Sequence, residues 1–372
     1  MVDLGTQYQE IKSEINAAIQ EVLDTTTFIG GPVVKSFQTS LEEYLNVKHV
    51  IPCANGTDAL QIALMALGLK PGDEVITPSY TYIATTEVIA LLGLKPVFVD
   101  VDPNTFCINI DLIEQAITPK TKAIVPVHLY GQGADMEPLM KLANKYQLFV
   151  VEDTAQAIGS DYLFADSSQK KLGTIGTIGC TSFFPSKNLG CYGDGGAIFT
   201  NDDKLAESIR MIANHGQRVR YYHDVVGCNS RLDAIQAAIL NVKLPHLNRY
   251  IDSRIQVADY YDKVLGASDK ITVPYRDGKS KHVFHQYTVK LADGVDRDKL
   301  QAFLAEKDIP SMIYYPVPAH KQGMFASFQL GDLNLPVTDD LTKRVISFPI
   351  HTEMENEQLE YICSAILTFV NA

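Results

Sequence analysis

Short runs of β-branched and other apolar residues alternate with amphipathic stretches through the first two thirds of the chain. Six runs have the composition of buried strands: Glu74–Pro78, Pro96–Val101, Ala123–Val127, Leu148–Glu152, Thr181–Phe184 and Ala197–Thr200. Four stretches between them show helical spacing of apolar positions: Asp58–Leu67, Thr85–Leu92, Met136–Tyr146 and Lys204–Asn214. This alternation predicts an α/β fold with a largely parallel sheet covered by helices on both faces. Ligands of such folds bind at the carboxyl ends of the strands.

The pattern changes at both ends of this region. An opening helix is expected at about Tyr8–Leu23, followed by a shaped loop at Thr25–Pro32. A long helical pattern from Arg231 is interrupted at Pro245, continues to about Leu265 and predicts a bridge between two domains. Beyond it we expect a strand at Gln286–Leu291, a helix at Arg297–Lys307, a strand near Met312–Tyr315 and a helix at Asn356–Val370. The chain is thus expected to form a large domain over residues 1–245 and a smaller α+β domain over residues 246–372.

The composition is that of an ordinary globular protein. The chain has 372 residues, 46% hydrophobic and 20% charged, which at roughly 150 residues per domain is enough for two or three domains. Its 44 acidic residues outnumber its 32 basic residues, so the net charge is −12. This surplus argues against nonspecific binding to nucleic acid or to an anionic membrane. No apolar run approaches the roughly 18 residues of a membrane helix, since Val88–Leu94 ends at Lys95.

Neither the first residues nor the cysteines indicate export. Met1–Gly5 lacks the basic and apolar regions of a secretory signal, so the cytoplasm is the expected compartment. Six cysteines without a Cys-x-x-Cys pair are too sparse for a disulfide framework or a structural zinc site. His282 and His285 have a spacing that metal sites tolerate, but no cysteine or acidic partner is close in sequence. We interpret them as structural and expect no metal.

The segment Asn55-Gly56-Thr57 follows an apolar stretch and opens a predicted helix. Backbone N–H groups at a helix start, together with a hydroxyl, bind phosphate groups well. The same residues also suit an N-cap without any ligand. The segment alone leaves both interpretations open.

Two further segments place an ionisable side chain after a buried strand. Asp153 follows Val150–Glu152, where a carboxylate can face a bound heterocycle or cap the next helix. Lys187 lies among apolar and small residues in Thr181–Gly190, and Gly193–Gly196 follows. Loss of water around a lysine lowers its pKa and makes the amine a nucleophile that forms Schiff bases. A lysine whose ammonium reaches the surface is the alternative.

Taken in order, five features form a constellation that is improbable by chance. They are the Gly56-Thr57 turn, Tyr82, Asp153 with Gln156, Ser182 and Lys187. This constellation resembles the DegT-type sugar aminotransferases, which are pyridoxal 5′-phosphate (PLP) enzymes of aminotransferase fold type I. The likeness covers nearly the whole chain, from Val2 to Ala372. It implies a large domain with a mostly parallel seven-stranded sheet flanked by helices, and a smaller C-terminal α+β domain.

The resemblance implies two catalytic residues. Lys187 would hold PLP as a Schiff base, and Asp153 would pair with the pyridine nitrogen. A carboxylate there keeps the ring protonated, so that the ring accepts electrons from a carbanion. Once displaced by the donor, Lys187 would move a proton as general base and acid. The donor implied by the resemblance is L-glutamate, which converts PLP to pyridoxamine 5′-phosphate before a keto-sugar is aminated.

The resemblance also implies further contacts to the cofactor. Tyr82 would stack on the ring and Gln156 would contact its phenolic oxygen. The phosphate would be held by Gly56, Thr57 and Ser182. Asn229 matches the position that reaches the phosphate bound by the other subunit. A homodimer with shared active sites is therefore expected.

For the acceptor, two stretches look most like aminotransferases that act on UDP-linked 3-oxo-N-acetylglucosaminuronate. They are His215–His223 and Cys53–Asp58. This implies a role in bacterial surface polysaccharide biosynthesis, such as that of O-antigen. Substrate contacts are expected at Arg231, Tyr315 and His320, with Arg231 acting as a bidentate donor to a carboxylate or diphosphate. A salt bridge between Arg231 and a nearby acidic residue is equally compatible with the sequence.

Two alternatives remain open at this level. The acceptor can instead be a dTDP- or GDP-linked keto-deoxyhexose. The chain can also be a PLP-binding regulatory protein that has lost turnover, although the presence of both Asp153 and Lys187 argues against this.

Overall fold

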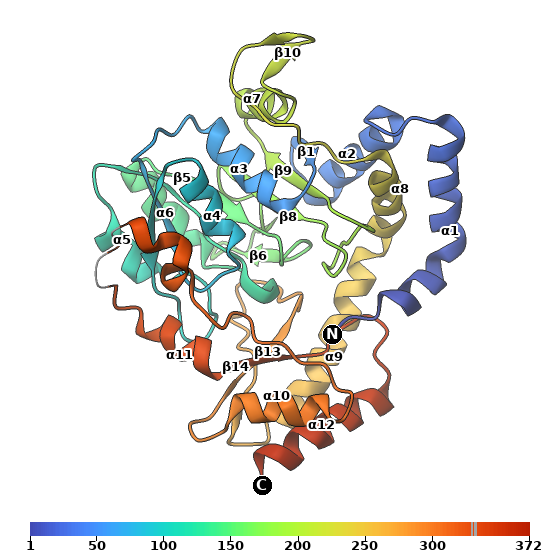
Figure 1. Cartoon of the computed structure of the whole chain (residues 1–372), viewed down its shortest axis with the longest axis vertical. Helices are drawn as coiled ribbons and strands as arrows, with labels where there is room; N and C mark the ends of the chain where they lie inside the picture. Colours follow the sequence, from blue (N-terminus) through green and yellow to red (C-terminus); the bar gives the residue numbers. More distant parts are fainter. Residues whose placement is uncertain (329, 331–332) are drawn as a thin grey trace.

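A seven-stranded sheet forms the centre of the protein (Figure 1), whose computed structural model describes residues 1–328, 330 and 333–372. Its strand order is β1-β9-β8-β5-β4-β2-β3. The strands are β1 (His49–Cys53), β2 (Glu74–Pro78), β3 (Lys95–Val99), β4 (Thr121–Ile124), β5 (Phe149–Asp153), β8 (Ile178–Ser182) and β9 (Gly196–Thr200). Strand β9 is antiparallel to both neighbours, and the other adjacent pairs are parallel. The predicted class and the mostly parallel seven-stranded sheet are confirmed.

Successive residues of each strand face opposite sides of this sheet and enter two different cores. Val75 of β2 packs in one core, and its neighbour Ile76 packs in the other. Val151 and Val150 of β5 divide in the same way. The helices over the two faces are α3 (Gly56–Ala66), α4 (Ala84–Leu91), α5 (Ile113–Ala116), α6 (Met136–Tyr146) and α7 (Asp203–Ala213). Burial on both faces explains why the strands are nearly continuous apolar runs in the sequence.

Helices at the start of the chain pack beside the long helical segment in its second half. These helices are α1 (Leu4–Thr25), α2 (Gly31–Leu45), α8 (Ala234–Lys243) and α9 (Leu247–Leu265). Both α1 and α2 contact α8, and α9 leads on to the second sheet (Figure 1). Helix α2 was not predicted, and the expected loop ends at Gly30, whose positive φ of 66° precedes the helix. Pro32 in the first turn of α2 fits a helix start, because a proline there sacrifices no hydrogen bond.

The C-terminal third forms an antiparallel three-stranded sheet with helices beside it. Its elements are β12 (Ile271–Thr272), β13 (Tyr287–Leu291), β14 (Val345–Phe348), α10 (Arg297–Ala305), α11 (Pro336–Arg344) and α12 (Asn356–Val370). The strand expected near Met312–Tyr315 is wrong: only Met312 pairs, with Ser347 of β14, as an isolated bridge. The segment then meets Pro316 and Pro318, which cannot donate to a sheet ladder. The carbonyl of Tyr314 instead accepts hydrogen bonds from the phenols of Tyr80 and Tyr130.

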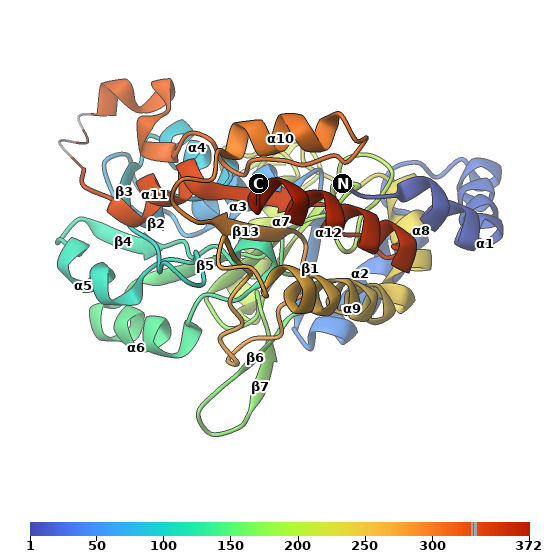
Figure 2. The same ribbon diagram turned by 90° about the horizontal axis from the view of Figure 1, so that it is seen from below.

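Two hairpins project from the body of the protein. One is formed by β10 (Gln217–Val219) and β11 (Tyr222–His223) beside α7 (Figure 1), and the other by β6 (Asp161–Leu163) and β7 (Gln169–Lys171) (Figure 2). Short 3₁₀ helices occur at Ile110–Leu112, Leu129–Gly131, Leu244–His246, Ala319–Lys321 and Gly323–Phe328. Within the described ranges, we find no helix with the length and apolar composition needed to cross a membrane.

Candidate active site

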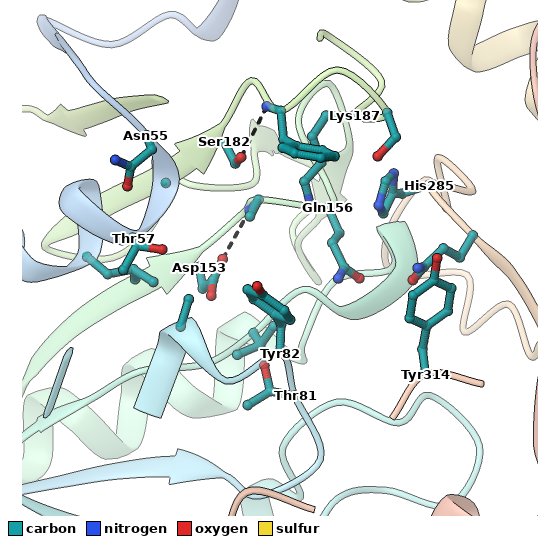
Figure 3. Close-up of a pocket in the computed structure, with 18 of the residues that line it drawn as sticks. Asn55, Thr57, Thr81, Tyr82, Asp153, Gln156, Ser182, Lys187, His285 and Tyr314 are labelled. Carbon is teal, nitrogen blue, oxygen red and sulfur yellow. Dashed lines mark hydrogen bonds between the residues drawn. The ribbon is translucent and has the colours of Figure 1, made fainter. Parts of the chain in front are cut away.

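A cavity of about 590 Å³ lies where β5 and β8 end and α3 begins. Eight of the residues that the sequence singled out line it: Gly56, Thr57, Tyr82, Asp153, Gln156, Ser182, Lys187 and Tyr315. They come from segments far apart in the chain (Figure 3). The volume is in the range of small-molecule sites. The carboxyl ends of the strands therefore carry a cavity where the sheet topology predicts one.

One end of the cavity is formed by the first turn of α3. The side chain of Asn55 caps this helix by accepting a 2.8 Å hydrogen bond from the backbone N–H of Asp58. Gly56 lies so close to β8 that an added Cβ would come within 2.7 Å of Ser182 Cβ. Only glycine allows this approach, which places the hydroxyls of Thr57 and Ser182 at the same cavity. The positive end of a helix beside two hydroxyls is suited to a phosphate group.

Asp153 is the last residue of β5, and only 6% of its surface is exposed. Its Oδ2 accepts a 2.8 Å hydrogen bond from Thr85 Oγ1, and its Oδ1 accepts a 3.1 Å bond from the backbone N–H of Ala155. No helix follows directly, since residues 155–159 form turns. The carboxylate is thus held at the cavity wall and does not cap a helix.

Lys187 lies on the turn after β8 and reaches the cavity that Asp153 also lines. Among the described residues, its ammonium group has neither a hydrogen bond nor a salt bridge. Burial lowers the pKa of Lys187 to about 8, although the negative charge of Asp153 acts in the opposite direction. A large fraction of this amine is therefore neutral and nucleophilic near pH 8.

Aromatic side chains and an amide form the opposite wall. Gln156 Oε1 accepts a 2.6 Å hydrogen bond from the backbone N–H of Tyr130, and its Nε2 donates to the hydroxyl of Tyr315 at 3.0 Å. The rings of Tyr315 and Tyr82 lie 6.0 Å apart. Tyr82 is 56% exposed, so its ring is free to cover a flat ligand in the cavity.

His285 and Gln286 also line this cavity, and the sequence did not identify them as site residues. Burial, with the positive charges of Lys187 and Arg254, holds the pKa of His285 well below its usual range, so the ring is neutral. Arg254 fixes this segment by donating to the carbonyl oxygen of His285 at 3.3 Å. The structural interpretation holds for His282, which stacks on Phe284 with ring centroids 3.8 Å apart. The sequence indicated only that His285 directly precedes the strand expected at Gln286–Leu291.

Three predicted residues lie outside the cavity lining. Asn229 and Arg231 are exposed, and Arg231 forms no salt bridge with any described residue. His320 is absent from the cavity lining, and its Nδ1 is 2.7 Å from Ser79 Oγ. In the part of the chain that the structure describes, no cluster of three or more His, Cys, Asp or Glu residues could hold a metal ion.

A sheet whose strand ends carry a partner-free lysine, a buried carboxylate and a helix start suited to phosphate defines the class of fold type I PLP enzymes. Comparison with protein families is more specific. Residues 9–367 match the DegT/DnrJ/EryC1/StrS aminotransferase family, and the chain belongs to this family. The resemblance inferred from the sequence is confirmed, and the protein is a PLP-dependent aminotransferase.

Two relatives are equally similar to the chain but carry different names. The UDP-2-acetamido-2-deoxy-3-oxo-D-glucuronate aminotransferase of Pseudomonas aeruginosa is 47% identical, over 98% of this chain and 98% of its own length. The "pleiotropic regulatory protein" of Geobacillus stearothermophilus is also 47% identical, over 99% of this chain and 98% of its own length. One name matches the main expectation from the sequence, and the other names a regulatory protein, as one of the alternatives does.

Solved structures agree with the fold and the cofactor. DesV of S. venezuelae, solved with a ketimine intermediate, superposes with a TM-score of 0.95 at 37% identity, covering 100% of this chain and 98% of that one. NtdA of Bacillus subtilis, solved with bound pyridoxamine phosphate, has a TM-score of 0.89 at 32% identity, covering 98% of this chain and 82% of that one.

Proposed function

We propose that this aminotransferase moves an amino group from L-glutamate to UDP-linked 3-oxo-N-acetylglucosaminuronate. The product would be a diamino uronic acid for bacterial surface polysaccharide such as O-antigen, made in the cytoplasm. The observation that carries the chemistry is the partner-free amine of Lys187 in one cavity with the buried carboxylate of Asp153. The acceptor is supported by the similarity to the Pseudomonas aeruginosa enzyme.

The residues of the cavity fit PLP. The cradle between Gly56 and Ser182, which a Cβ would fill, suits the phosphate at the start of α3. When bound, PLP supplies a ring that accepts the electrons left on the α-carbon of the donor after proton loss. Asp153 would keep the ring nitrogen protonated, and the amide of Gln156 would form a hydrogen bond with the phenolic oxygen. Tyr82 would cover the ring and exclude water.

Lys187 has two tasks in this proposal. Its neutral amine would hold the cofactor, which is feasible near neutral pH because burial lowers its pKa to about 8. With the donor bound, Nζ would be free to act as general base and acid and to move the proton of the α-carbon of L-glutamate. The same proton transfers in reverse would serve amination of the keto carbon of the sugar.

We propose that Tyr315, His320 and Arg231 contribute to acceptor binding. Tyr315 is at the cavity, with its hydroxyl oriented by Gln156. His320 lies against Ser79 outside the cavity lining, so it would reach the acceptor only after a rotation of its ring. Arg231 is exposed and partner-free among the described residues, so its guanidinium is available for a carboxylate or diphosphate.

We further propose a homodimer in which Asn229 and Arg231 serve the active site of the other copy. Both residues are exposed and absent from the cavity of their own chain. Large apolar side chains are exposed in the preceding segment and near the start of α2: Phe28, Ile29, Tyr221, Tyr222 and Val226. Mixing Asn229→Ala with Lys187→Ala protein should restore activity that neither variant has alone, and a mixture without activity would contradict shared sites.

A panel of acceptors tests the proposed function. The PLP-loaded protein is treated with L-glutamate, which should bleach the visible absorbance, and each UDP-, dTDP- or GDP-linked keto-sugar is then offered. We expect the UDP-linked 3-oxo uronate to restore the absorbance fastest. The UDP-linked 3-oxo-N-acetylglucosamine, which has a hydroxymethyl group in place of the carboxylate, is the matched control. Recovery with dTDP- or GDP-linked sugars alone would favour the deoxyhexose alternative, and a spectrum that never changes would favour a regulatory protein.

A further inference from the structure

Lys243 is a buried lysine that the proposed chemistry does not use. It lies in the last turn of α8, and only 2% of its surface is exposed. Among the described residues it has no carboxylate partner. Its Nζ donates a 2.8 Å hydrogen bond to the carbonyl oxygen of Gly190 and lies 4.8 Å from the centre of the Tyr192 ring. Burying an ammonium group without an anion is costly, so the burial of Lys243 requires an explanation.

Gly190 belongs to the same turn as Lys187. This turn is closed at its base by a 2.8 Å hydrogen bond from the N–H of Cys191 to the carbonyl of Phe183. The chain passes so close to itself that a Cβ on Gly190 would come within 2.3 Å of the carbonyl oxygen of Pro185. The N–H of Lys187 bonds within the turn, to the carbonyl of Phe184 at 2.8 Å. Displacement of Gly190 would therefore be passed on to the backbone of Lys187.

Two side-chain hydrogen bonds tie this turn to other segments, at the two neighbours of Leu189. Asn188 Nδ2 donates to the carbonyl of Val283 at 2.9 Å, and Lys243 Nζ donates to the carbonyl of Gly190. We propose that Lys243 is a positioning residue, whose bond to the Gly190 carbonyl holds the turn that presents the Lys187 amine to the cavity. This inference rests on the proposed role of Lys187. Without Lys243, the buried carbonyl of Gly190 would lack its donor, and the turn would shift to reach water.

The test is the chemical reactivity of Lys187 in the full-length chain without cofactor. Acetylation by acetic anhydride is followed by mass spectrometry between about pH 6 and pH 11. In the parent protein the midpoint of labelling should lie near pH 8. In Lys243→Met the released turn should admit water, so we expect the midpoint to rise by about one unit and PLP affinity to fall about tenfold. Lys243→Arg keeps a charged donor and should recover most of both losses.

Lys171 provides a control, because it makes two contacts of the same kinds elsewhere. Its Nζ donates to the carbonyl of Gly159 at 3.2 Å and lies 5.2 Å from the ring centre of Tyr44, but unlike Lys243 it also pairs with Asp161 at 2.9 Å. Lys171→Met should leave the labelling midpoint of Lys187 unchanged. An equal shift in this control, or a parent-like midpoint in folded Lys243→Met, would overturn the inference.

A second variant covers the case in which Lys243→Met does not fold. Lys243→Gln is uncharged and one bond too short to keep the contact, so it should still raise the midpoint, and a parent-like midpoint in this variant overturns the inference. Because labelling uses no cofactor, the result stands apart from the proposed function. Failure of that function would appear in the acceptor panel, with Lys187 reactivity unaffected.

Discussion

The hydroxyl of Thr85 donates a 2.8 Å hydrogen bond to Oδ2 of Asp153. Thr85 is 1% exposed and belongs to the first turn of α4, which follows β2. Its oxygen also lies 3.1 Å from Thr81 Oγ1, and because Thr85 uses its only proton on Asp153, Thr81 is the donor of that second bond. The connection after β2 thus orients the carboxylate at the end of β5.

Replacement of Thr85 by valine should weaken cofactor binding. The substitution conserves the volume but removes a hydrogen bond to a charged group, which is worth about 1.5–3 kcal/mol. We expect the dissociation constant of PLP, measured by absorbance titration, to rise about tenfold or more. Thr86→Val is the control, since among the described residues the hydroxyl of Thr86 bonds only the carbonyl of Ile83, the residue directly before α4. Unchanged PLP binding in Thr85→Val would show that Asp153 needs no such orientation.

Lys187→Ala should abolish covalent attachment of PLP and turnover while leaving the fold intact. Removal of a general acid and base costs about a hundredfold to ten-thousandfold in rate, and loss of the attachment adds to this. The measurements are borohydride trapping followed by mass spectrometry, the rate with L-glutamate, and circular dichroism. Lys204→Ala, on the exposed face of α7, should behave as the parent. Activity at the parental level in Lys187→Ala would refute the proposed mechanism.

Lys187 should also contribute to the pH dependence of the unfolding free energy in the cofactor-free protein. Burial lowers its pKa from 10.5 to about 8, so between these values the unfolded chain binds more protons than the folded chain. The cost of burying the charge is therefore present in full below pH 8 and is relieved as the pH rises to 10.5.

Lys187→Met should accordingly reduce the slope of unfolding free energy against pH in this window. The reduction should be at most the slope that about one bound proton contributes. Urea denaturation at several pH values, compared between parent and variant, isolates this contribution from other titrating groups. Lys204→Met should keep the parental slope. Identical slopes in parent and Lys187→Met would mean that the folded chain does not perturb this amine.

Glu152→Gln should lower the stability of the folded chain and leave the cavity largely unchanged. Glu152 is fully buried and accepts hydrogen bonds from the N–H groups of Gly173, Ile175 and Gly176 and from His128 Nε2. His128 Nδ1 accepts from a backbone N–H, so Nε2 carries the proton. An amide would turn an NH₂ group toward these donors.

We expect Glu152→Gln to lose about 3–5 kcal/mol of unfolding free energy in urea denaturation. The exposed Glu114, which pairs with Lys145, serves as comparison, and Glu114→Gln should cost far less stability, because water screens exposed ion pairs. A loss of similar size in both variants would argue that the buried carboxylate has no special role.

Much of the large sheet could be predicted because each buried strand leaves a local signature. All six predicted strands overlap strands of the sheet, and the helix at Met136–Tyr146 has the predicted bounds. The direction of β9 could not be predicted, since Ala197 and its neighbours are buried in either orientation. The division at residue 245 stays a prediction, because α8 and α9 follow each other with only a 3₁₀ turn between them.

The candidate site also has residues that the sequence indicated and residues that it did not. Asp153 and Lys187 were candidates because each is an ionisable residue in an unusual local context, and the resemblance to the sugar aminotransferases then brought them together. His285 could not be identified, because its proximity to Lys187 depends on packing of the second sheet against the first. Thr85 gave no signal, since it lies on α4 and its partner Asp153 lies at the end of β5, far away in the sequence.

By itself, the sequence determined which segments are buried and which side chains are candidates for the chemistry, because hydrophobic periodicity and unusual residues in apolar surroundings are local properties. Only the tertiary structure decided which of these side chains meet and what surrounds them. The lowered pKa of Lys187 arises from atoms contributed by several segments, and the buried contact between Lys243 and Gly190 joins two distant ones. Such contacts depend on distance in space, which the order of residues does not record.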